Sequence, residues 1–187
     1  MAFETILSIF LGVGLAASVG FRIFLPLFFL SLAAYFNVWE LNENWQWIGS
    51  FTALIVLGVA TMVEIFAYFI PWLDNLLDSV AIPMAALAGT AVMVSTASNL
   101  DPLITWTLAI IAGGGTATAI KGASATGRLA STATTGGTAN PVIGLVETGT
   151  AAVVATASIF APILAAFLVL IILIGIFRIY KKLRPKT

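Results

Sequence analysis

Residues 5–36 read TILSIFLGVGLAASVGFRIFLPLFFLSLAAYF, and this stretch decides the fold. It is almost entirely apolar, with Arg22 as its one charged residue. A straight helix of this length would extend about 48 Å at 1.5 Å per residue, whereas the hydrocarbon core of a bilayer is about 30 Å thick. We therefore predict a helix break between Gly20 and Pro26, since glycine and proline are the usual sites of kinks.

The composition places the whole chain in a membrane. Of its 187 residues, 60% are hydrophobic and 9% are charged, with a mean hydropathy of +1.10, whereas soluble domains are roughly 25% charged. Further apolar blocks cover residues 48–70, 81–98, 102–120, 141–160 and 161–180. The fold class expected is all-α: a polytopic membrane helix bundle of about six spans in a single transmembrane domain over residues 1–187, with five or seven spans as alternatives.

Charge near the chain ends predicts the orientation. Five of the eight basic residues follow the last apolar block: Arg178, Lys181, Lys182, Arg184 and Lys186. The positive-inside rule then puts the C-terminus in the cytoplasm, in an inner or plasma membrane. With six crossings the N-terminus would also be cytoplasmic, and the tryptophan-rich acidic loop at residues 37–47 would face outward. A re-entrant hairpin at a helix break would change this parity.

A second stretch, residues 101–139, resembles the first in its interruptions. Asp101 and Pro102 predict a helix N-cap and first position. The helix that follows meets Gly113–Gly115, two basic residues and a pair of glycines, Gly136 and Gly137, at which we predict a second break. Each interrupted stretch precedes a Val-Glu dipeptide, so residues 5–98 and 102–180 can be interpreted as two inverted three-helix repeats with broken helices. Chance recurrence in a membrane sequence is the alternative.

Five charged residues lie in or beside the apolar blocks: Arg22, Glu64, Lys121, Arg128 and Glu147. Unpaired in lipid they would cost roughly 12 to 18 kcal/mol, as much as the roughly 5 to 15 kcal/mol that stabilises a typical protein. We therefore predict that the two glutamates approach the three basic residues inside the bundle. Lys121 and Arg128, seven apart, would share one face of a continuous helix. These residues form the candidate solute- or ion-binding site; static ion pairs that fix helix register are the alternative.

Catalytic chemistry finds little support in this sequence. The chain has no Cys and no His, which removes the commonest nucleophile, general base and zinc ligands. The segment from Gly115 to Gly122 only superficially resembles a phosphate loop, because Ile120 stands where a glycine precedes the lysine. We expect no enzyme activity, no cofactor and no metal site. Eight acidic residues balance eight basic ones, so we expect no nucleic-acid partner.

The chain resembles the DUF4126 family of small integral membrane proteins over nearly its whole length. Seven residues carry the resemblance: Gly20, Arg22 and Pro26 in the first half, and Lys121, Arg128, Asn140 and Glu147 in the second. The family is named for lacking a known function, so the resemblance implies a membrane setting and a fold type, without a substrate.

Two functions remain open at this stage. The first is a small transporter or channel for a solute or ion, in which the charge cluster lies at mid-membrane and its basic residues favour an anion. The second is a non-transporting subunit or scaffold, with static charges. Beyond the lipid bilayer, the partners expected are a small solute or ion, a second copy of the chain, or a larger membrane complex. A water-accessible cavity that reaches Glu64 and Glu147 would favour transport.

Overall fold

The computed structural model describes residues 2–98 and 100–183, and every element within them is helical. The elements are α1 (Ala2–Phe21), α2 (Phe24–Tyr35), η1 (Glu43–Gly49), α3 (Phe51–Ala67), α4 (Pro71–Thr96), α5 (Pro102–Leu108), η2 (Ala109–Gly114), α6 (Gly115–Thr135), α7 (Asn140–Phe160) and α8 (Pro162–Leu183). Five of these described helices are long and apolar enough to cross a membrane, or six if η1 and α3, bent by 65°, form one span. The predicted polytopic membrane helix bundle is confirmed.

The first helix breaks at Arg22 and Ile23, inside the predicted segment. Pro26 explains the position, because its ring opposes the carbonyl four residues earlier and it has no N–H to donate. As the third residue of α2, Pro26 lies in the first helical turn, where a missing N–H costs nothing. The expected role of Gly20 is wrong in detail, since this residue lies within α1. A Cβ there would approach the Ile120 Cβ at 2.6 Å, so Gly20 allows α1 and α6 to pack closely.

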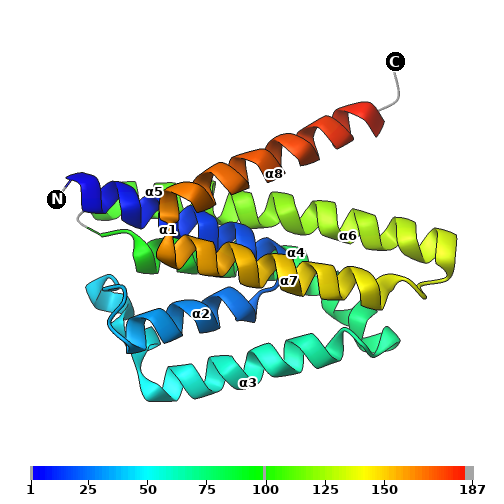
Figure 1. Cartoon of the computed structure of the whole chain (residues 1–187), viewed down its shortest axis with the longest axis horizontal. Coiled ribbons are helices and arrows are strands. Elements are labelled where there is room, and N and C mark those ends of the chain that lie inside the picture. Colours follow the sequence, from blue (N-terminus) through cyan, green and yellow to red (C-terminus); the bar gives the residue numbers. More distant parts are fainter. Residues whose placement is uncertain (1, 99, 184–187) are drawn as a thin grey trace.

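The break produces a re-entrant hairpin, in which α2 runs back toward the end of the bundle where α1 begins (Figure 1). Glu4 and Ser8 of α1 line the same hollow as Trp39 and Glu40 of the loop that follows α2. At about 18 Å, a 12-residue helix is too short for a core of about 30 Å. The corner of the hairpin therefore lies within the length of the bundle.

This hairpin changes the parity of the chain. The start of α1 and the acidic loop share one end of the bundle, whereas α8 runs toward the opposite end (Figure 1). The start of α1 and the end of α8 therefore lie at opposite ends of the bundle, and the expectation that both termini share one side is not met, whereas helix length and composition allow five or six spans. A cytoplasmic C-terminus stays a prediction; Arg178, Lys181 and Lys182 end α8, and the other two basic residues of the tail, Arg184 and Lys186, lie outside the described residues.

The second interrupted stretch behaves differently from the first. Asp101 caps the helix as predicted, accepting a hydrogen bond from the Leu103 N–H at 2.8 Å. From Pro102 to Thr135 the chain is one continuous helix, with a π-helical segment at Ala109–Gly114. It ends where Gly136 and Gly137 adopt positive φ angles of 62° and 84°, so that predicted break is a turn between α6 and α7. Inverted repeats would place corresponding helices in opposite directions, whereas α1 and α6 run in the same direction (Figure 1), so the inverted-repeat relation is not confirmed.

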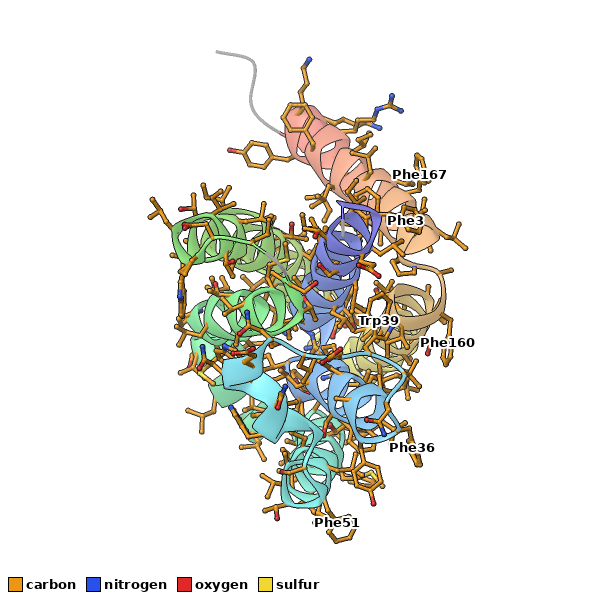
Figure 2. All side chains as sticks on the ribbon, turned by 90° about the vertical axis from the view of Figure 1, so that its left-hand side faces the viewer. Phe3, Phe36, Trp39, Phe51, Phe160 and Phe167 are labelled. Carbon is orange, nitrogen blue, oxygen red and sulfur yellow. The ribbon has the colours of Figure 1, made fainter. Side chains whose placement is uncertain are left out.

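The core surrounds α1, which packs against α4, α6, α7 and α8. Its Leu11, Leu15 and Val19 side chains are buried. The outside is aromatic and apolar: Figure 2 shows the rings of Phe3, Phe36, Phe51, Phe160 and Phe167 at the periphery. Trp39 instead turns inward, and its indole N–H donates to the Ile159 carbonyl at 2.8 Å. The apolar exterior matches a lipid environment.

Candidate functional site

Glu64 of α3 caps the broken helix. Its two carboxylate oxygens accept hydrogen bonds from the Ile23 N–H at 2.7 Å and the Phe24 N–H at 3.0 Å. These are the free donors at the N-terminus of α2, and the Ile23 side chain cannot cap them. A carboxylate also suits the positive end of the helix dipole. Glu64 therefore replaces the backbone hydrogen bonds that the break removes.

Arg22 lies at the corner of the hairpin and is fully buried, with 1% of its surface exposed. Its Nε donates to the Thr148 hydroxyl at 2.9 Å, and its Nη2 donates to the Gly144 carbonyl at 2.7 Å. The same Nη2 lies 3.9 Å from the Glu147 carboxylate. The guanidinium is thus held mainly by α7, far along the chain from the break.

Glu147 of α7 accepts hydrogen bonds from two side chains of α6. Arg128 donates to both carboxylate oxygens, from Nε at 3.2 Å and from Nη2, which also forms an ion pair with it. The Ser124 hydroxyl donates to one of the same oxygens. Such fork-shaped pairing fixes the carboxylate in direction as well as distance.

Helical periodicity explains how each element presents these groups. Lys121, Ser124 and Arg128 recur at spacings of three and four residues, so they share one face of α6. On α7, Glu147 and Thr148 follow Gly144 by three and four residues, so both lie near it on one face. The prediction that Lys121 and Arg128 share a face is confirmed, because α6 continues without a break between them.

Tyr68, directly after α3, lies at the centre of the basic residues. The ring centroid is 4.0 Å from the Arg22 Cζ and 4.5 Å from the Arg128 Cζ. Lys121 Nζ lies 5.5 Å from the centroid and donates to the Tyr68 hydroxyl at 3.3 Å. The negative face of an aromatic ring attracts cations, so Tyr68 lets three buried positive charges lie close together.

The structure therefore brings all five predicted site residues together in the interior, each at most 6% exposed. Glu147 approaches Arg22 and Arg128 as predicted. Glu64 interacts electrostatically with Arg22, but its hydrogen bonds go to backbone N–H groups instead. The other predicted residues have structural roles: Pro26 shapes the hairpin, Gly20 allows α1 and α6 to pack closely, and Gly136 and Gly137 form the distant α6–α7 turn.

Sequence reasoning missed Tyr68, Ser124, Gly144 and Thr148. Tyr68 lies four residues after Glu64 and so on the same helix face, which is a usable signal. Gly144 has a spatial role, since a Cβ there would lie 3.1 Å from the Arg22 Nη2 and 3.5 Å from the Arg128 Nη2. The glycine makes room for two guanidinium groups.

The cluster is closed and lies off-centre. Glu147 is seven residues, about 10 Å, from the start of α7, and Arg128 is as far from the end of α6. Its nearer end is thus the one with the α6–α7 turn. An apolar groove of about 770 Å³ between α2 and α3 does not include Glu64 or Glu147 among its lining residues. A cavity of about 30 Å³ adjoins Arg22 and Tyr68.

Metal ligands do not gather in this site. Among residues 2–98 and 100–183, no three His, Cys, Asp or Glu side chains lie together as a metal ion would need. The chemistry on offer is that of hydrogen-bond donors: guanidinium, ammonium and hydroxyl groups directed at a carboxylate.

A comparison with family models places the chain. The model described as "Domain of unknown function (DUF4126)" matches residues 9–182, nearly the entire length. The chain belongs to the DUF4126 family. The resemblance drawn from the sequence is confirmed, and four of the residues that carried it, Arg22, Lys121, Arg128 and Glu147, lie in the buried cluster of this DUF4126 protein. No curated protein and no solved structure matches the chain.

Proposed function

We propose that this DUF4126 protein is a transporter or channel for a small anion, with the buried cluster as its binding site. The observation that carries the proposal is the setting of Glu147. Its carboxylate, itself an anion, is bound by the Arg128 fork and the Ser124 hydroxyl, with Arg22 3.9 Å away. Donors that bind a tethered carboxylate also fit a free anion of similar charge.

The proposed mechanism is displacement. When Glu147 takes up a proton or turns away, the Arg128 and Ser124 donors become available to a substrate anion. Return of the carboxylate then expels that anion. Charged groups kept inside a membrane protein at high cost mark ion and proton pathways, and a tethered competitor makes binding reversible.

Helix α2 supplies a movable part near the site. It is a short re-entrant helix, and its N-terminus is joined to α3 through Glu64. Discontinuous helices near the binding site are common in secondary transporters. Both glutamates are sealed in the described conformation, so transport requires an opened state, for which the nearer α6–α7 end is the shorter route.

The second candidate is a non-transporting subunit or scaffold, and the sealing of Glu64 and Glu147 favours it. Fully satisfied buried charges can serve only to fix how helices pack. In that case the protein would function as a homodimer or within a larger membrane complex, and the apolar exterior would contact partners.

Flux in sealed proteoliposomes tests the proposal. We expect the wild type to conduct small monovalent anions and not alkali cations, and the Arg128→Gln variant to lose this flux at least tenfold. Lys181→Gln, which removes an exposed basic residue of α8, is the matched control and should match the wild type. Absence of anion flux, or equal flux in a correctly folded Arg128→Gln protein, would favour the scaffold. Copurification of a stoichiometric partner would then identify the complex.

A further inference from the structure

One nitrogen of the Arg22 guanidinium makes no hydrogen bond to the described residues. Its Nε and Nη2 are engaged with Thr148 and Gly144, but Nη1 is buried and has no hydrogen-bond partner among the described residues. Leaving a charged donor unsatisfied in the interior costs more free energy than leaving a neutral donor unsatisfied. The site therefore calls for a ligand that the protein itself does not supply.

The small cavity beside Arg22 has room for such a ligand. It measures about 30 Å³ and lies between the hairpin corner, the end of α3 and the first half of α7. About 10 to 15 Å³ of such space holds one water, so the cavity takes one or two water-sized species. A monatomic anion fits this space, whereas phosphate or an organic carboxylate does not.

The walls favour an anion over water. A buried water needs roughly two to four polar partners. Of the other hydrogen-bonding side chains at this cavity, Thr148 donates to the Gly144 carbonyl and accepts from Arg22, and the Tyr68 hydroxyl accepts from Lys121 and keeps its own O–H to donate. Ile65, Phe69 and Leu145 make the rest of the wall largely apolar, and no acidic residue lines it. A guanidinium donor and a phenol donor against apolar surface suit a weakly hydrated anion.

We infer that this cavity, lined by Arg22, Tyr68, Gly144 and Thr148, is a binding site for one monovalent anion of halide size. The inference deepens the proposed function, on which it rests, by naming the substrate class. The bound anion would lie next to the Arg22 guanidinium, which also approaches Glu147. The anion and the Glu147 carboxylate would therefore share one positive charge. Larger anions are excluded by volume.

Bromide is the probe for the test, with the full chain in detergent. Crystals grown in bromide should show an anomalous peak within hydrogen-bond distance of Arg22 Nη1. Bromide should also raise the thermal unfolding temperature in a saturable way, as any ligand of the native state does. Ile65→Phe fills the cavity without replacing a charged or hydrogen-bonding side chain and should weaken the bromide response at least tenfold. Ile65→Leu, the matched control, should keep it.

The outcomes separate this site from the transport proposal. A water in the cavity with no anomalous peak, or an unchanged response in Ile65→Phe, would overturn the site. Anion flux that persists in Ile65→Phe liposomes, with no bromide at Arg22, would overturn the site and leave transport standing. Bromide bound at Arg22 in a wild type that carries no flux would support the site and defeat the transport proposal.

Discussion

At the scale of single residues, the cluster depends on one aromatic ring that two guanidinium groups face. Arg22 and Arg128 lie 4.0 and 4.5 Å from the Tyr68 centroid, and Lys121 bonds the hydroxyl. Tyr68→Phe removes only the charge-assisted hydrogen bond, at roughly 1.5 to 3 kcal/mol. Tyr68→Leu also removes the cation–π contacts, each worth about 2 kcal/mol when desolvated. Unfolding in micelles should show that Tyr68→Leu is less stable than Tyr68→Phe. Tyr35→Phe, at an exposed tyrosine, is the control and should be near wild type. Equal stability losses in Tyr68→Leu and Tyr68→Phe would contradict the role of the ring.

The ion pair between Glu147 and Arg128 gives a second prediction at this scale. Either Glu147→Gln or Arg128→Gln leaves a buried charge without its partner, at a cost of about 3 to 5 kcal/mol. The double variant should be less destabilised than the sum of the singles, with a coupling of roughly 0.5 to 3 kcal/mol for residues in contact. Chemical unfolding of all four proteins measures this. Glu40→Gln, in the exposed loop, is the control, and additive effects would refute the pairing.

Five charged residues could be predicted from the sequence because their insertion cost alone demands a shared interior. Ser124 and Thr148 could not, since hydroxyl groups are common in membrane helices and their positions matter only once α6 and α7 meet, whereas Tyr68 had its spacing of four residues from Glu64 as a signal. The backbone N–H groups that Glu64 binds could not be identified from the sequence. Backbone N–H groups exist at every residue but proline, so no side-chain pattern identifies the two that a break sets free.

At the scale of elements, the α1–α2 corner is held by Glu64. Glu64→Ala would leave the Ile23 and Phe24 N–H groups without acceptors, at about 1 to 3 kcal/mol for each buried donor, whereas Glu64→Gln keeps one oxygen. Hydrogen exchange at residues 23 and 24 should therefore be fastest in Glu64→Ala and intermediate in Glu64→Gln. Thr61→Ala, one turn earlier on α3 and bonded within its own helix, should leave exchange there unchanged. Uniform exchange across the variants would remove the capping role.

Glycine and proline act differently in the two interrupted stretches. Pro26 removes a hydrogen bond and breaks the first helix, whereas residues 103–140 contain no proline. Glycines there cost about 1 kcal/mol each but leave every N–H in place, so the helix continues and adjusts through its π segment. The predicted break at Gly136 and Gly137 marks the end of α6 for the same reason that glycine ends many helices: it adopts positive φ.

Close packing of α4 against this helix gives a matched pair of predictions. A Cβ at Gly113 would lie 2.7 Å from the Met93 Cβ and meets the Gly89 backbone, whereas one at Gly115 meets nothing within 4 Å. Gly113→Ala should therefore lower stability by roughly 1 to 3 kcal/mol through overpacking, and Gly115→Ala should raise it by up to about 1 kcal/mol. Thermal unfolding of the two variants measures both effects. Equal shifts of the unfolding temperature would show that the π-helical segment tolerates separation from α4.

At the scale of the whole molecule, the all-helical membrane fold followed from composition and block length, but the parity of the crossings did not. Counting apolar blocks treats residues 5–36 as one span. A break at Arg22 is compatible either with a kinked crossing or with a hairpin, and only the packing of α2 against α3 and α7 separates the two. One short helix thus decides on which side of the membrane the N-terminal end lies.

Labelling of single cysteines tests this arrangement, and the absence of native cysteine makes each introduced thiol unique. Glu4→Cys and Asn44→Cys lie at the loop end, and Thr138→Cys, in the α6–α7 turn, and Lys182→Cys, in the last turn of α8, belong to segments at the other end (Figure 1). An impermeant maleimide should label the first pair in intact cells and the second only after permeabilisation, because the basic end of α8 favours the cytoplasm. Leu15→Cys, in the core, should resist labelling in both. Should Glu4→Cys and Lys182→Cys respond from the same side, α2 would have to complete a crossing, and the hairpin that positions Arg22 would be wrong.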